Sequence, residues 1–133
     1  MSADGRQVPA TDADRTAADR FVAACGRANV RRVLVIGGAS GDRGSLLTLL
    51  RALDIRAIDG TEGLTDDRAD RLADWADVVV LWGAELHRTV TEHFGPGGRS
   101  RSAVSIVVDQ PGIAALLDEA TLHLPFGNRS APR

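Results

Sequence analysis

Two short runs of β-branched and leucine residues constrain the fold more than any other feature of this sequence. Residues 33–36 are followed by two glycines and residues 78–82 by one, and neither run contains a charged side chain. A strand that is apolar on both sides needs cover on both faces of its sheet, as in a parallel sheet between layers of helices. The two runs therefore predict central strands of an α/β protein.

Helical patterns alternate with the predicted strands. We expect strands at 31–38, 55–58, 77–82 and 104–108, and a short fifth strand at 121–124. Apolar residues recur at helical spacing between and after the strands: Leu46, Leu47, Leu50 and Leu53; Leu72 and Ala76, after a Thr65 cap; Leu86, Val90 and Phe94; and Ile113, Leu116 and Leu117. One helix for each crossover predicts a single doubly wound parallel sheet of four to five strands, flavodoxin-like or Rossmann-like, in the order 2-1-3-4-5.

An extra N-terminal helix is expected before the first strand. Residues 11–25 place Ala18, Phe21 and Cys25 on one side, and Gly26 follows as the residue expected to end the helix. The predicted organisation is a disordered lead-in with this amphipathic helix over 1–29, the α/β domain over 30–126 and a polar tail over 127–133.

Composition excludes several classes of function. The net charge of −2 gives no field that attracts nucleic acid or an anionic membrane, and all 16 basic residues are arginine. No run reaches the roughly 18 apolar residues of a membrane span, and the first residues lack a secretory signal, so we expect a cytoplasmic protein. The single cysteine, Cys25, excludes an internal disulfide, and His93 and His123 lack partners at metal-ligand spacing. The sequence requires no metal and no cofactor.

Parallel sheets of this kind bind ligands beyond the carboxyl ends of their strands, where the strand order reverses. In the predicted order, that point lies between the first and third strands. The ligand-binding residues predicted there are Gly37, Gly38, Ser40, Gly41, Arg43, Asp59, Trp82, Gly83, Glu85 and His87.

The glycine-rich segment 37–45 is expected to form a loop that leads into a helix N-terminus, where backbone N–H groups favour an anionic ligand. It has neither the lysine of a P-loop nor the full G-x-G-x-x-G spacing of dinucleotide-binding proteins. Asp59 follows the glycines by about 20 residues, the distance at which an acid binds ribose hydroxyls in dinucleotide folds. Trp82 is a candidate for stacking on a ring, or alternatively closes the core.

Glu85 and His87 are weak candidates for acid–base catalysis, because residues two apart on a helix do not face each other. The alternative is that Glu85 favours the helix N-terminus and His87 is a polar surface residue. A phosphate-accepting receiver domain is excluded, since the first strand ends in Ile36-Gly37 and the third in Trp82-Gly83, without the required acids.

Residues 32–117 resemble an uncharacterised bacterial family catalogued as domain of unknown function 2325. The resemblance rests on the segments 33–38 and 76–80, on Asp59-Gly60, and on His87, where the family tends to show Ser-His. Leu86 replaces that serine here, and a cysteine often seen later in the same helix is absent. The resemblance implies a Rossmann-like domain. More distantly, the segment 82–86 is similar to the glutamate-bearing segment of Toll/interleukin receptor-like domains, which implies NAD cleavage with Glu85 as the catalytic acid.

Three hypotheses follow for the function. The first is a non-catalytic binding or regulatory module for a small anionic ligand, such as a nucleotide. The second is a NAD- or nucleotide-cleaving enzyme that uses Glu85 or His87. The third is a protein-interaction or self-assembly domain, in which the N-terminal helix and exposed helix faces contact a partner or form a homodimer.

Overall fold

Four parallel strands form one sheet in the order β2-β1-β3-β4. The computed structural model describes residues 11–61, 63–83, 86–94 and 104–124, so the predicted lead-in over 1–10 and tail over 127–133 lie outside the described residues. The strands are β1 (Arg32–Gly37), β2 (Asp54–Ile58), β3 (Val78–Trp82) and β4 (Val104–Val108). The predicted α/β class, the doubly wound parallel sheet and the order of its first four strands are confirmed.

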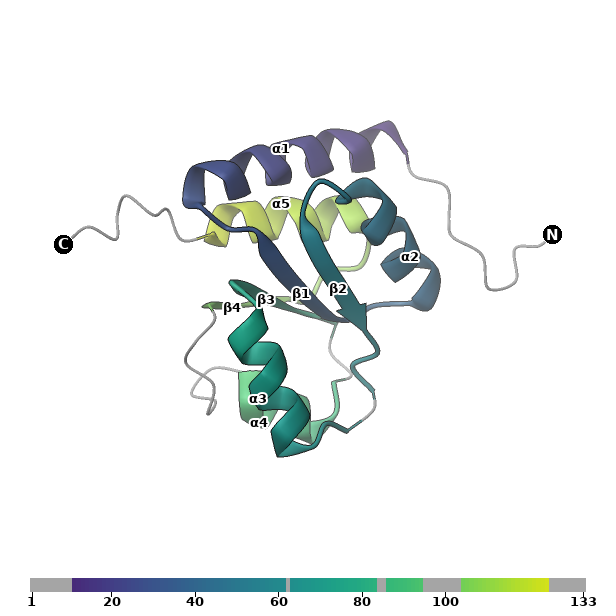
Figure 1. Ribbon diagram of the computed structural model, residues 1–133. Coiled ribbons are helices and arrows are strands. Elements are labelled where there is room, and N and C mark those ends of the chain that lie inside the picture. Colours follow the sequence, from purple (N-terminus) through teal and green to yellow (C-terminus); the bar gives the residue numbers. More distant parts are fainter. Residues whose placement is uncertain (1–10, 62, 84–85, 95–103, 125–133) are drawn as a thin grey trace.

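Helices cover both faces of the sheet (Figure 1). They are α1 (Asp12–Ala28), α2 (Ser40–Leu49), α3 (Asp66–Trp75), α4 (Arg88–Phe94) and α5 (Ile113–His123). Val33 and Val35 of β1 face the core shared with α1, α2 and α5, whereas Leu34 and Ile36 face the core shared with α3 and α4. This arrangement explains why β1 has no polar side.

The start of β1 is held by the side chain of Asp77, the residue that precedes β3. Oδ2 of Asp77 accepts hydrogen bonds from the backbone N–H groups of Arg31 and Arg32, at 2.9 and 3.0 Å. Burial is the larger and the negative charge of Asp77 the smaller of two effects that raise the pKa of the Cys25 thiol to about 12. Cys25 is thus a small buried core residue, as predicted.

The predicted fifth strand at 121–124 is wrong, because α5 continues through His123. Leu116, Leu117 and Ala120 are all buried on one face, so the helical burial pattern continues up to this segment. The hydroxyl of Thr121 donates to the carbonyl of Leu117 at 2.7 Å, which satisfies it within the helix.

The predicted end of α1 at Gly26 is also wrong. Asn29 takes the left-handed conformation (φ 59°), and the N–H of Val30 donates to the carbonyl of Cys25 at 2.8 Å. This is the six-to-one hydrogen bond of a Schellman motif, which asparagine supports almost as glycine does. In α2, Leu47 leaves the face predicted for it and is 40 % exposed, because it lies about 100° around the helix from the buried Leu46.

Among the described residues, no helix is both long enough and apolar enough to span a bilayer.

The end of α1 gives a first prediction. Gly26→Ala should raise the free energy of unfolding by about 0.5–1 kcal/mol, because Gly26 is helical and a methyl group there meets nothing within 4 Å. Asn29→Ala should lower it by about 1 kcal/mol, since alanine tolerates a positive φ poorly. Urea denaturation measures both changes. If Gly26→Ala destabilises the protein, this description of the end of α1 is wrong.

Candidate functional site

A cavity of ≈ 390 Å³ lies at the carboxyl ends of β1, β2 and β3. This is the point where the strand order reverses, at which ligands bind in open parallel sheets. The residues that line it are Gly37, Gly38, Asp59, Thr61, Trp82, Gly83 and Leu86. Five of the ten predicted site residues therefore meet around one cavity. Thr61 was not singled out from the sequence, and Leu86 belongs to the predicted segment without having been assigned a role.

The glycines at the end of β1 allow its backbone to approach β3. Gly37 has φ +114° and Gly38 has φ +80°, values that favour glycine. A Cβ atom on Gly37 would lie 2.1 Å from the carbonyl oxygen of Trp82, and one on Gly38 would lie 2.3 Å from the Trp82 ring. No side chain fits at either position, so these two residues contribute only backbone to the cavity wall.

Leu86 fills part of the crevice between these strand ends. Its Cδ2 atom lies 3.1 Å from the position of a Cβ on Gly37 and 2.4 Å from that of a Cβ on Gly60. The side chain is half-buried and packs against the core below α3 and α4. The cavity is therefore bounded by an apolar side chain where the resembled family tends to have a serine.

Trp82 has little surface left for a ligand. Its side chain is 3 % exposed, and its indole N–H donates to the carbonyl of Gln110 at 3.1 Å. Of the two roles considered for it, this burial favours closing the core over stacking on a ring.

The glycine-rich segment is shorter as a loop than predicted. The prediction of a loop over 37–45 is wrong, because α2 begins at Ser40 and includes Gly41, Arg43 and Gly44. Only residues 38–39 connect strand and helix, and Ser40, Gly41 and Arg43 are not among the residues that line the cavity. Arg43 instead donates to the carbonyl of Gly38 and so holds this short turn.

Asp59 carries a stable negative charge at the end of β2. The backbone N–H of Thr61 donates to its Oδ1 at 2.9 Å, and the Thr61 hydroxyl donates to the same oxygen at 2.8 Å. The backbone bond and then the hydroxyl bond hold the pKa of Asp59 below its ordinary value, and the charge of Arg43 adds to this effect. The carboxylate is therefore ionised at neutral pH, and it is exposed to solvent.

His87 has a structural task at the start of α4. Its backbone N–H donates to the carbonyl of Gly60 at 2.6 Å, and its Nδ1 accepts from the backbone N–H of Thr89 at 3.1 Å. The Thr89 hydroxyl accepts from the N–H of Leu64 at 2.8 Å, so its own hydrogen points to Nδ1 of His87, 2.9 Å away. Nδ1 thus carries no proton and caps the helix, as an N-cap side chain does. Glu85 lies outside the described residues.

The described residues contain no cluster of three or more side chains suited to a metal ion. His93 is buried, and its Nε2 lies 3.0 Å from Oδ1 of Asp66, which links α4 to the first turn of α3. His123 is 3.0 Å from Glu119 within α5. Both histidines thus lie away from the cavity lining.

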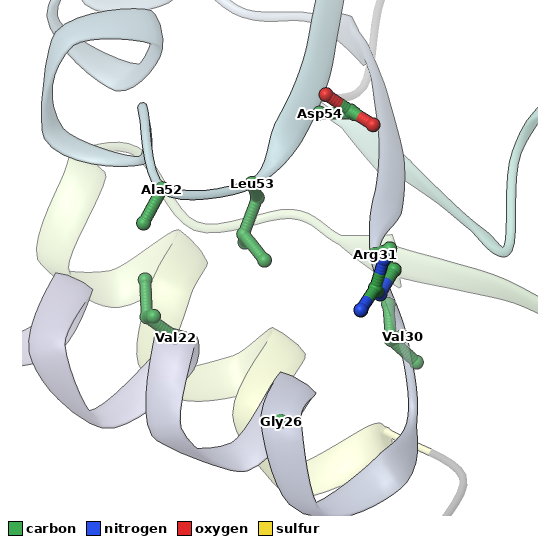
Figure 2. Close-up of a pocket in the computed structure, with 7 residues that line it drawn as sticks. All are labelled: Val22, Gly26, Val30, Arg31, Ala52, Leu53 and Asp54. Carbon is green, nitrogen blue, oxygen red and sulfur yellow. The ribbon is translucent and has the colours of Figure 1, made fainter.

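A second cavity, of ≈ 490 Å³, lies near the amino end of β2 (Figure 2). Val22 and Gly26 of α1 lie opposite Ala52 and Leu53, which precede β2, and Val30, Arg31 and Asp54 complete the lining. It lies at the end of the sheet opposite to the usual ligand site. We therefore place the candidate site at the first cavity.

No family model, no curated protein and no solved structure matches this chain. The resemblances to domain of unknown function 2325 and to Toll/interleukin receptor-like domains accordingly remain predictions.

The cap at His87 gives a second prediction. His87→Ala should lower the free energy of unfolding by about 1 kcal/mol, because it removes the acceptor for the N–H of Thr89. His87→Asn keeps a side-chain acceptor and should recover most of this loss. Urea denaturation of the three proteins measures the difference, and equal stabilities for the alanine and asparagine variants would contradict the capping role.

Proposed function

We propose that this chain is a non-catalytic binding or regulatory module of the cytoplasm that binds a nucleotide, or a similar ligand with vicinal hydroxyls and an anionic group. The observation that carries the proposal is the cavity of ≈ 390 Å³ lined by the ends of three strands and by the ionised carboxylate of Asp59. Ligand pockets in proteins generally hold about 300–1,000 Å³, so the cavity suits a small ligand.

Asp59 supports the hydroxyl part of this proposal. Both hydrogen bonds from Thr61 go to Oδ1, so Oδ2 accepts no hydrogen bond from the described residues. An ionised carboxylate in this position is an acceptor for the hydroxyls of a ribose. The bonds from Thr61 also fix the orientation of the carboxylate, which lowers the entropy lost when a ligand binds.

The turn at 38–39 supports the anionic part. Gly38 lines the cavity, and α2 begins two residues later without a side-chain cap at Ala39. Backbone N–H groups in the first turn of a helix favour an anion, and the nearby charge of Arg43 acts in the same direction. Asp42, also in the first turn, acts against it. The balance favours a ligand with one phosphate over one with a long polyphosphate chain.

The capping role of His87 supports binding over catalysis, because its Nδ1 is already used as an acceptor. The enzyme alternative, cleavage of NAD or a nucleotide by Glu85, is tested separately by incubating the chain with each compound. It predicts release of nicotinamide or free base during incubation, and loss of that release in Glu85→Gln.

Calorimetric titration of the intact chain with AMP, ADP, ATP and NAD tests the proposal. We expect AMP to bind, and Asp59→Asn to weaken its affinity about tenfold, since a hydrogen bond to a charged group contributes about 1.5 kcal/mol or more. 2′-Deoxy-AMP should bind the wild-type chain more weakly than AMP does, because it lacks one of the paired hydroxyls.

Asp70→Asn is the matched control, because it removes one carboxylate from the exposed side of α3 and should leave the affinity unchanged. If none of the four compounds binds at millimolar concentration, the proposed function is wrong. If AMP binds equally well to wild type and to Asp59→Asn, the role of Asp59 is wrong.

A further inference from the structure

The outer edge of β2 is a row of backbone groups that no described strand covers. β2 is the terminal strand of the sheet, with β1 on its other side (Figure 1). Unpaired strand edges are templates for pairing with another chain. The β2 edge is therefore open to pairing with a further strand.

Backbone geometry fixes which residues of β2 point outward. The N–H of Asp54 donates to the carbonyl of Arg31 at 3.0 Å, so Asp54 directs its backbone groups toward β1. In a parallel ladder this direction alternates along the strand, so Arg56 also points inward, whereas Ile55 and Ala57 point their N–H and C=O groups outward.

We propose that β2 pairs antiparallel with β2 of a second copy of this chain, with Ile55 opposite the partner's Ile55 on the twofold axis. In this register the two Ile55 residues exchange both of their outward hydrogen bonds. Asp54 lies directly opposite the partner's Arg56, and Arg56 lies opposite the partner's Asp54. The twofold axis thus generates two identical pairs of opposite charge.

The neighbouring registers are disfavoured by charge. A shift of two residues is the smallest shift that keeps outward backbone groups opposite each other. In one direction it places Arg56 opposite the partner's Arg56, and in the other it places Asp54 opposite the partner's Asp54. Like charges directly opposite each other destabilise an antiparallel pair. The charge pattern of β2 therefore selects one register for self-pairing.

Side chains on both sides of β2 extend this edge into a contact surface. A groove of ≈ 500 Å³ runs beside the strand, lined by Leu47, Leu53, Asp54, Ile55, Arg56 and Trp75. Leu47 of α2 is 40 % exposed on the side of Ile55, and on the other side the Arg56 guanidinium lies 4.4 Å from the centre of the Trp75 ring. In the proposed dimer the partner strand lies between these two walls.

The occupant we infer is a second copy rather than an unrelated peptide, because the charges of β2 complement β2 itself. The surface differs from the helix faces that the sequence suggested for self-association. A five-residue ladder with two flanking walls is a small interface, so we expect a reversible dimer with a dissociation constant of about 1–100 µM.

Sedimentation equilibrium of wild type, Asp54→Arg and Arg56→Asp tests the pairing. Each single variant places two like-charge pairs at the interface, and we expect its dimerisation to be weaker by about tenfold or more. An equimolar mixture of the two variants restores opposite charges in a heterodimer, so it should dimerise as wild type does. Asp19→Arg makes the same change of charge on the exposed face of α1 and should leave dimerisation unchanged.

The double variant Asp54→Arg/Arg56→Asp exchanges the two charges within one chain and should also dimerise, which provides a second readout if either single variant fails to fold. Circular dichroism verifies the fold of each protein. A wild-type chain that remains a monomer at ~500 µM overturns the proposal. The proposal is also overturned if both single variants dimerise as strongly as wild type. The same holds if the equimolar mixture of the single variants and the double variant both remain monomeric.

Discussion

The close approach of β1 and β3 at Gly37 is the constraint on which the rest of the structure depends. The position of a Cβ on Gly37 is 2.1 Å from the Trp82 carbonyl oxygen, so only glycine permits the two strands to pair up to their last residues. Beside this contact, Gly38 packs against the indole of Trp82, and Leu86 fits between Gly37 and Gly60. The cavity is the space left above this packed floor, and its shape follows from the three strand ends.

The two ends and the outer edge of the sheet have different chemistry. The carboxyl ends combine the ionised, fixed carboxylate of Asp59 with the backbone N–H groups at the start of α2. This combination suits binding. At the amino ends of β1 and β3, the backbone N–H groups of Arg31 and Arg32 donate structural hydrogen bonds to Asp77. The edge at β2 carries charges of opposite sign at Asp54 and Arg56, and outward backbone groups at Ile55 and Ala57. In the proposed antiparallel dimer, each copy has its own candidate cavity, and the two lie at opposite ends of the paired strands. Each cavity therefore remains open to its own ligand.

Much of the fold could be predicted from the sequence because burial on both faces leaves a direct signal in β1 and β3. The errors occurred where local residue preference and packing disagree. Thr121 favours a strand by type, yet the buried face of α5 keeps it helical, and Asn29 rather than Gly26 supplies the positive φ that ends α1. Within the site, Gly37, Gly38 and Asp59 could be predicted from the expected strand order together with the glycine run and the spacing of the acid. The bonds from Thr61 and the capping role of His87 could not, because both depend on how separate loops pack together.

Chemical-shift mapping of the ¹⁵N-labelled chain with AMP tests most directly whether the cavity at the strand ends is the ligand site. Our account predicts saturable shifts of the backbone amides of Gly37, Gly38, Thr61 and Gly83, which line or border that cavity. Amides of Val22, Ala52 and Leu53, at the cavity near the start of β2, should not shift. Shifts confined to this second group, or no saturable shifts at all, would contradict the account.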